Sequence, residues 1–163
     1  MTLFIGGIKS GKSKNAEMHI LKKAQEKPIY LATNEFFDAE MQVKVQKHKE
    51  QREERFITLE EPLDLFKIIK ENDKPVLVEC VSMWINNMLY HKRSEADMMH
   101  QLKQITELNK ALVFVINDVS CSIVAADKLS RTFVEINGRV AQYLAQECDA
   151  VYNTVAGISV QIK

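Results

Sequence analysis

The residues with the clearest chemical meaning lie close to the amino terminus. Gly6, Gly11, Lys12 and Ser13 occupy the defining positions of the P-loop pattern G-x-x-x-x-G-K-[ST]. Glycines let such a loop wrap tightly, with backbone N–H groups that point inward and hold phosphate oxygens. The lysine would reach the terminal phosphates, and the serine hydroxyl would ligate Mg²⁺. The pattern therefore predicts a nucleoside triphosphate site and leaves open what is done with the nucleotide.

A second set of reactive side chains falls in residues 38–55, which are predicted to form a charged helix. Met41, Val45, His48 and Arg52 recur at helical spacing, so they share one stripe. Histidine suits nucleophilic attack or proton transfer near neutral pH, and arginine suits bidentate contact with phosphate. The spacing leaves two interpretations open: a catalytic helix face, or a solvated helix that carries one histidine among many charges.

Glu79 is a third candidate, because it falls at the carboxyl end of a predicted buried strand over residues 76–80. In a P-loop protein, this is where an acidic residue that helps to hold magnesium is expected. The alternative is a surface glutamate at the edge of a sheet. The other histidines, His19, His91 and His100, are predicted to be surface residues rather than catalytic ones.

Alternating strands and helices are predicted to position these residues. The strands are expected at 2–5, 29–33, 76–80 and 111–116, with a brief extended piece at 56–58. The helices are expected at 13–24, 38–55, 82–90, 95–108 and 128–147, with a bend near Gly138, and a further helix is expected to open at Glu60–Pro62. Residues 149–155 and 159–162 alternate as a hairpin around Ala156 and Gly157. This order predicts an α/β fold with a mostly parallel sheet, helices on both faces and a C-terminal antiparallel hairpin.

Composition narrows the class of protein. The 163 residues predict a single domain, 1–163, and 22 basic against 22 acidic side chains give no support to a nucleic-acid or membrane-surface role. No apolar run approaches the roughly 20 residues needed to span a bilayer, and no signal peptide is evident. Cys80, Cys121 and Cys148 are widely separated and lack metal-ligand spacing, which predicts a reducing, cytoplasmic location.

Short segments spread over essentially the whole chain match the pattern of one known family, and they occur in the same order as in that family. The segments and residues concerned are Gly6–Glu17; Tyr30–Thr33; Glu40, Met41, Val45, His48, Arg52, Thr58 and Glu60; Leu77–Cys80; Trp84–Leu89; Asn117–Val119; Ile123 and Val124; Arg131 and Phe133; Gly138 and Arg139; Gln142–Ala145; and Val155–Lys163. With this set the sequence resembles the bifunctional adenosylcobinamide kinase / adenosylcobinamide-phosphate guanylyltransferase family.

The resemblance implies a trimer with a RecA-like P-loop fold that acts in cobalamin biosynthesis and salvage. ATP or GTP would phosphorylate the aminopropanol hydroxyl of adenosylcobinamide. GMP from GTP would then pass to that phosphate through a GMP–histidine intermediate, and the family's histidine falls on His48. The resemblance implies that Lys12 is the second catalytic residue and that Ser13 and Glu79 ligate Mg²⁺. The implied nucleotide contacts are Gly6, Gly7, Ile8, Lys9, Ser10, Gly11, Lys12, Ser13, Ala32, Thr33, Asn34, Lys49, Glu50, Gln51, Arg52, Glu60 and Glu79.

The chain also departs from the family's pattern. The stretch Asn117–Ala125 carries Ser120 and Ser122 where the family usually has glycines, and it lacks the family's proline. The remaining substitutions are Lys9 and Lys44 for arginine and Ala141 for asparagine. Three alternatives follow: a divergent member that has lost one activity, another small-molecule P-loop kinase in which His48 is incidental, or a nucleotide-dependent switch. The lack of an evident Asn-Lys-x-Asp motif speaks somewhat against the switch.

Overall fold

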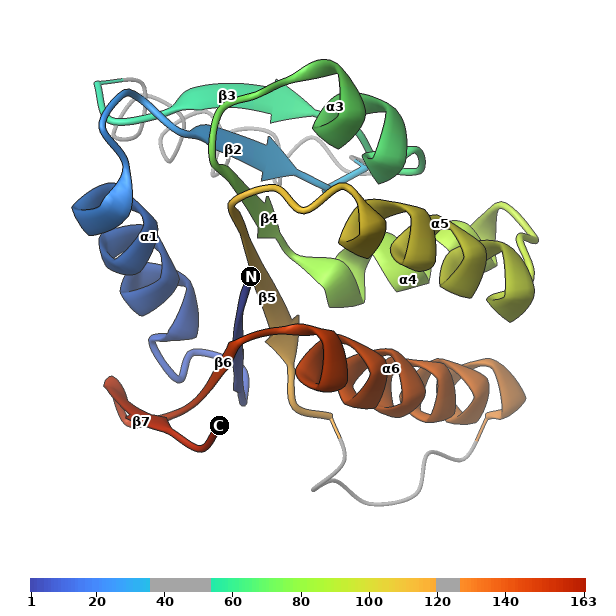
Figure 1. Cartoon of the computed structure of the whole chain (residues 1–163). Coiled ribbons are helices and arrows are strands. Elements are labelled where there is room, and N and C mark those ends of the chain that lie inside the picture. The colour runs from blue at the N-terminus through green and yellow to red at the C-terminus, as the bar shows by residue number, and fades with distance from the viewer. Residues whose placement is uncertain (36–53, 120–126) are drawn as a thin grey trace.

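The fold is built on one mixed sheet. A computed structural model describes residues 1–35, 54–119 and 127–163. In these ranges seven strands form a sheet in the order β3-β2-β4-β5-β1-β6-β7 (Figure 1). Every neighbouring pair is parallel except β6 and β7. The strands are β1 Thr2–Gly6, β2 Ile29–Ala32, β3 Ile57–Glu60, β4 Val76–Glu79, β5 Leu112–Asn117, β6 Ala150–Val155 and β7 Ile158–Gln161.

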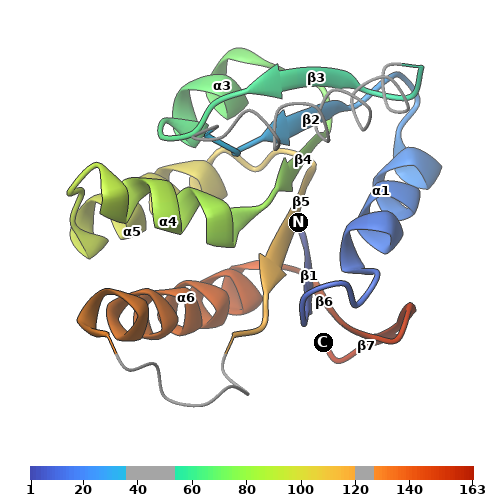
Figure 2. The same ribbon diagram turned by 180° about the vertical axis from the view of Figure 1, so that it is seen from behind.

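Helices cover both faces of the sheet. The helices of the described residues are α1 Lys12–Lys23, α3 Leu65–Glu71, α4 Val81–Tyr90, α5 Glu95–Glu107 and α6 Lys128–Glu147. Helix α1 lies on one face, and α3 to α6 lie on the other (Figures 1 and 2). Among the described residues, no helix has both the length and the apolar character needed to cross a bilayer.

Two apolar clusters, one on each face, explain this layering. Ala16 and Ile20 of α1 pack with Phe4 and Tyr30 of the sheet. On the opposite face, Trp84 of α4 is fully buried in a larger cluster to which α3, α5 and α6 also contribute. Because the central strands β4 and β5 are covered on both sides, they consist of nearly continuous apolar residues. The predicted α/β class is therefore confirmed.

One predicted boundary is wrong. The helix expected to open at Glu60–Pro62 begins instead at Leu65, because Glu60 ends β3 and Asp64 is the N-cap. The Asp64 carboxylate accepts a hydrogen bond from the backbone N–H of Lys67 at 3.0 Å, which satisfies one free donor of the first turn. The long helix predicted at 128–147 is present as α6, and it runs without interruption through Gly138.

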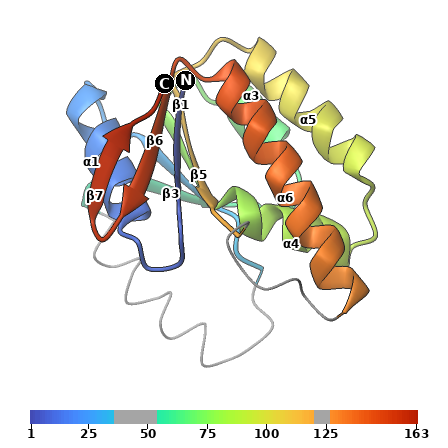
Figure 3. The ribbon, with the colours of Figure 1, turned by 90° about the horizontal axis from the view of Figure 1, so that it is seen from below.

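The C-terminal hairpin forms one edge of the sheet. Strand β6 lies parallel to β1, and β7 returns antiparallel to it with Val155 opposite Ile158, as predicted. Ala156 and Gly157 have positive φ angles of 50° and 83°, which suit a tight two-residue turn. The N- and C-termini lie near each other (Figure 3), and the backbone N–H of Asp149 donates to the carbonyl of Met1 at 2.9 Å.

Candidate functional site

The P-loop joins β1 to α1 and lies against the turn of the hairpin. The N–H of Gly157 donates to the carbonyl of Ser10 at 2.7 Å. A Cβ at Gly6 would lie 2.4 Å from the carbonyl oxygen of Thr154 in β6. A Cβ at Gly11 would lie 2.9 Å from the Cα of Gly157. The loop therefore needs glycine at both motif positions because neighbouring backbone leaves no room for a side chain.

Gly11→Ala is expected to destabilise the protein, because Gly11 has a φ of +93° as well as this close approach. A left-handed conformation costs a residue with a side chain about 1–3 kcal/mol. Urea unfolding of the nucleotide-free protein would measure the loss. Gly7→Ala is the matched control, because Gly7 lies in the same loop and a Cβ there meets no atom within 4 Å. Equal losses in the two variants would contradict this explanation.

Lys12 is held over the loop that precedes it. It is the first residue of α1, it is only 6% exposed, and its Nζ donates to the carbonyl of Gly7 at 3.1 Å. The ammonium thus lies beside backbone groups of the P-loop, at the start of a helix whose dipole favours anions. This arrangement can bind phosphate oxygens. Ile8, by contrast, is 80% exposed in the same loop.

Ser13 and Glu79 come together from distant parts of the sequence. Ser13 is in the first turn of α1, and Glu79 ends β4. The Ser13 Oγ donates to the Glu79 Oε1 at 2.7 Å. Hydroxyl and carboxylate oxygens are the ligands that Mg²⁺ prefers, and Mg²⁺ commonly takes one or two carboxylates with phosphate and water completing its shell. The donor set therefore fits the predicted magnesium site.

Three strand ends form a row beside this pair. Ala32, at the end of β2, pairs in register with Glu60 of β3 on one side and Glu79 of β4 on the other. Asn34 follows β2 and is partly buried. The predicted contacts from separate segments thus share the carboxyl edge of the sheet, where open α/β folds bind ligands.

Thr33, which follows β2, connects that strand through its hydroxyl to the residue that follows β4. It accepts from the backbone N–H of Cys80 at 3.0 Å and donates to the carbonyl of Cys80 at 2.9 Å. The backbone N–H of Thr33 also donates to the carbonyl of Glu79 at 3.0 Å. Burial raises the pKa of the Cys80 thiol to about 11, and the neighbouring Glu79 carboxylate adds to the shift. The thiol is therefore protonated at neutral pH, and it lies beside the site without being a nucleophile.

Part of the predicted site lies outside the described residues. This applies to Met41, Lys44, Val45, His48, Lys49, Glu50, Gln51 and Arg52, to residues 38–53 of the helix predicted at 38–55, and to Ser120, Cys121 and Ser122. The last two residues of that predicted helix, 54 and 55, are described and form a turn, so the helix does not extend to Arg55 as predicted. The described part of the site consists of the phosphate-binding loop and the strand ends.

A buried polar network, which the sequence analysis did not identify, supports the end of β5. The Ser82 Oγ donates to the Asn137 Oδ1 at 2.7 Å and accepts from the backbone N–H of Asn117 at 2.9 Å. The Asn137 Nδ2 donates to the carbonyl of Asn117 at 3.0 Å. A cavity of about 200 Å³ lies beside it, with Ile5 and Gly138 in its lining. A polar residue within an otherwise apolar helix face was the only sequence signal for this network.

The three histidines among the described residues differ in exposure and in the residues that they contact. His100 is exposed, as predicted. His19 is partly buried, because its ring packs edge-on against Phe4 and Tyr152. Burial lowers the pKa of His19, and the nearby Lys23 lowers it further. His91 is exposed and contacts Glu35.

Comparison with known proteins extends the similarity to the full chain. A family model described as cobinamide kinase / cobinamide phosphate guanyltransferase matches residues 2–162. The bifunctional adenosylcobalamin biosynthesis protein CobU of Escherichia coli is 34% identical over 182 residues, covering 100% of this chain and 99% of the relative. Its namesake from Salmonella typhimurium is 33% identical with the same coverage. The bifunctional adenosylcobalamin biosynthesis protein CobP of Pseudomonas aeruginosa is 31% identical over 167 residues, covering 99% and 96%.

A solved structure supports the fold independently. The flagellar accessory protein FlaH from Methanocaldococcus jannaschii superposes with a TM-score of 0.51, covering 98% of this chain and 74% of that one. At 12% identity this likeness shows the fold alone. The full-length family match and the relatives above 30% identity decide the family. The chain belongs to the cobinamide kinase / cobinamide phosphate guanyltransferase family.

Proposed function

We propose that the chain phosphorylates adenosylcobinamide with ATP or GTP and then transfers GMP from GTP to the product, giving adenosylcobinamide-GDP for cobalamin synthesis. The observation that carries this proposal is the junction of a complete P-loop with the Ser13–Glu79 pair, in a chain that matches this family from end to end. Residues 1–163 would do this work as one domain.

In the first reaction the substrate hydroxyl attacks the γ-phosphate, loses its proton, and releases the nucleoside diphosphate. Lys12 would bind the terminal phosphate oxygens, supported by its position against the carbonyl of Gly7. Ser13 and Glu79 would hold Mg²⁺, which neutralises charge on the phosphates when bound. The P-loop residues Gly6 to Ser13 would surround the phosphates with backbone N–H groups.

In the second reaction a nitrogen of His48 would attack the α-phosphate of GTP and release pyrophosphate. The phosphate of the first product would then attack the same phosphorus, which restores the imidazole and completes the transfer. Arg52 and Lys49 would stabilise negative charge on the phosphates. The further nucleotide contacts proposed on the same ground are Ala32, Thr33, Asn34, Glu50, Gln51 and Glu60.

Chromatography with mass spectrometry tests the two reactions together. The purified chain would be incubated with adenosylcobinamide, Mg²⁺ and ATP, and GTP would be added later. The expected first product is adenosylcobinamide phosphate, and adenosylcobinamide-GDP should follow only after GTP is added. Phosphate product without the GDP derivative would indicate a member that has lost the transferase step. Absence of both products would overturn the proposal.

Glu79→Gln is expected to weaken metal-dependent activity, because the amide keeps the shape of the side chain but removes its charge. The Mg²⁺ concentration for half-maximal kinase activity should rise by about tenfold, as for loss of one charge-assisted contact. The thermal midpoint of the nucleotide-free protein should stay nearly unchanged. Glu71→Gln, at the exposed end of α3, is the control. An unaltered Mg²⁺ dependence in Glu79→Gln would remove Glu79 from the proposed metal site.

We also propose that the protein is a homotrimer and acts in the cytoplasm. Light scattering coupled to size exclusion should give three times the chain mass of 18.7 kDa. A monomer at micromolar concentration would contradict the trimer. The cytoplasmic assignment is supported by Cys80 and Cys148, which are both free thiols.

A further inference from the structure

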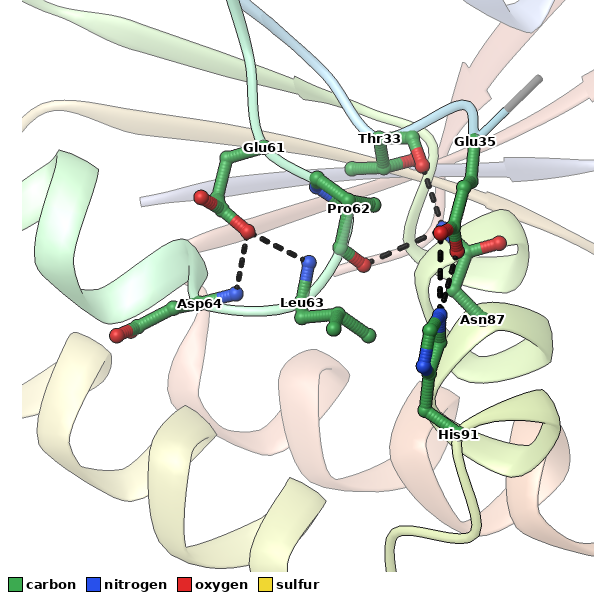
Figure 4. A network of polar contacts seen from close by, with 8 residues as sticks. All are labelled: Thr33, Glu35, Glu61, Pro62, Leu63, Asp64, Asn87 and His91. Carbon is green, nitrogen blue, oxygen red and sulfur yellow. Dashed lines mark hydrogen bonds and ion pairs between the residues drawn. The ribbon is translucent and has the colours of Figure 1, made fainter.

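Polar side chains hold the backbone at two places around the proposed nucleotide site. At the exits of β2 and β3, the Nδ2 of Asn87 in α4 donates to the carbonyls of Thr33 at 2.6 Å and Pro62 at 3.2 Å (Figure 4). On the other face of the sheet, Asn15 of α1 is hydrogen-bonded to the turn of the C-terminal hairpin. Because that turn contacts the P-loop, Asn15 is linked to the proposed phosphate site by hydrogen bonds.

Gly157 of the turn is bonded through both of its backbone polar groups. Its N–H donates to the carbonyl of Ser10 in the P-loop at 2.7 Å. Its own carbonyl accepts from the Nδ2 of Asn15 at 3.0 Å. The turn is thereby fixed between the loop and the first part of α1, which begins one residue after Gly11.

Two hydroxyl groups of the hairpin hold the side chain of Asn15. Its Nδ2 also donates to the Oγ of Ser159 in β7 at 2.7 Å. The Ser159 Oγ in turn lies 2.7 Å from the Oγ1 of Thr154, which is fully buried in β6. A hydroxyl can accept one hydrogen bond while it donates another, so Ser159 can bind both partners at once. The carboxamide of Asn15 therefore has its NH₂ group directed at the hairpin.

The bond to the Ser10 carbonyl determines where the next N–H points. The peptide bond between Ser10 and Gly11 is trans, so its C=O and N–H point in opposite directions. With the carbonyl bound by the hairpin, the Gly11 N–H points away from the hairpin. Inward-pointing N–H groups of this kind are what a P-loop uses to hold phosphate oxygens.

We propose that Asn15 and Ser159 are positioning residues for phosphate binding by the P-loop. Through Gly157 they hold the Ser10 carbonyl on the hairpin side, and they thereby orient the Gly11 N–H towards the phosphates. This rests on the nucleotide binding proposed above. Because one P-loop serves both nucleotides, the effect extends to ATP and GTP alike.

The test measures nucleotide binding to Asn15→Ala by calorimetry. The Kd for MgATP should rise about fivefold, the factor that corresponds to loss of one hydrogen bond, and the Kd for MgGTP should rise equally. The KM for ATP in the kinase step should rise with it while kcat changes by less than about twofold, because the Gly11 N–H would bind the phosphates equally before and during transfer. Alanine favours a helix more than asparagine does, so the thermal midpoint should stay near that of the wild type. A purely structural role would leave the Kd and KM of the folded protein unchanged.

Magnesium tripolyphosphate separates the phosphates from the rest of the nucleotide. It offers the P-loop a triphosphate chain without base or ribose, so its Kd should rise in Asn15→Ala by the same factor as that of MgATP. A rise for MgATP alone would place the effect at the base or the ribose and would overturn the proposal.

Ser159 variants test whether the hairpin is responsible. Ser159→Ala removes the hydroxyl that holds Asn15 and should also weaken MgATP binding, whereas Ser159→Thr keeps a hydroxyl and should bind MgATP as the wild type does. If Ser159 acts through Asn15, the variant that combines both alanines should lose no more affinity than Asn15→Ala alone. Gln161→Ala is the matched control and should leave the Kd unchanged. Gln161 lies on the same face of β7 as Ser159, and its side chain contacts Tyr152 and Lys163.

The outcomes separate this inference from the proposed function. An unchanged Kd for MgATP in Asn15→Ala, or losses that add in the double variant, would overturn the positioning role and leave the function intact. If Asn15→Ala does not fold, the Kd values of the two Ser159 variants decide the proposal. A wild-type chain that binds MgATP but makes no adenosylcobinamide phosphate would overturn the proposed function, and the Kd values would still decide the positioning role. A wild-type chain that does not bind MgATP would overturn both.

Discussion

Lys12→Ala is expected to lower the kcat of phosphoryl transfer by about 10²- to 10³-fold, the effect of losing one group that stabilises charge in the transition state. The physical reason is the position of the ammonium, which is nearly buried over the P-loop and beside the carbonyl of Gly7. Alanine there retains the helix start but removes the positive charge from the place where the γ-phosphate would gain negative charge. Initial rates with adenosylcobinamide and saturating ATP would measure the loss.

The control for this prediction is Lys14→Ala. Lys14 lies two residues along the same helix and is exposed, so its removal changes the net charge without changing the loop. Circular dichroism and a thermal melt should show that both variants are folded. A folded Lys12→Ala protein with full kinase activity would refute the assignment of this lysine.

The fold around the phosphate loop could be predicted because its determinants are local. The P-loop glycines, the apolar strand over 2–5 and the following helix are contiguous, and the structure places them as β1, loop and α1. The hairpin was equally local, because alternation and the turn at Ala156 and Gly157 suffice to define it. In these cases propensity, pattern and tertiary structure agree.

The error at α3 shows where local reasoning fails. Proline suits the first turn of a helix, and Glu60–Pro62 has the composition of a helix start. Pairing with β2 instead keeps Glu60 extended, since Ala32 and Glu60 are in register. The helix then starts at the next good N-cap, Asp64. A pairing between distant strands is not visible in a short window of sequence, and it overrode the local preference.

The supporting contacts of the site were equally invisible in the sequence. Glu79 could be predicted because it ends an apolar strand. Asn87 could not, because its partners Thr33 and Pro62 are distant in sequence and are bound through their backbone carbonyls. Nothing in the types of those two residues indicates an asparagine partner, so only the three-dimensional structure reveals the contact.

His48→Ala is the second change with a large expected effect. Guanylyl transfer should be abolished, because the imidazole is the proposed nucleophile and alanine offers no substitute. A histidine with the ordinary pKa of about 6.5 is largely neutral, and so nucleophilic, near pH 7. Phosphorylation of adenosylcobinamide should remain largely intact, because Lys12 and Ser13 still hold the γ-phosphate. Separate assays of the two reactions would show the difference, and a parallel fall in both would deny His48 this separate role.

The most direct measurement is covalent labelling with GTP that carries its label on the α-phosphate. The wild-type chain should retain the label after denaturation, in an adduct that is labile to acid and to hydroxylamine, as expected for a phosphoramidate. The His48→Ala variant should retain none, and GTP labelled on the γ-phosphate should label neither protein. A wild-type chain that traps no α-label, or an adduct that persists in His48→Ala, would contradict guanylyl transfer through this histidine.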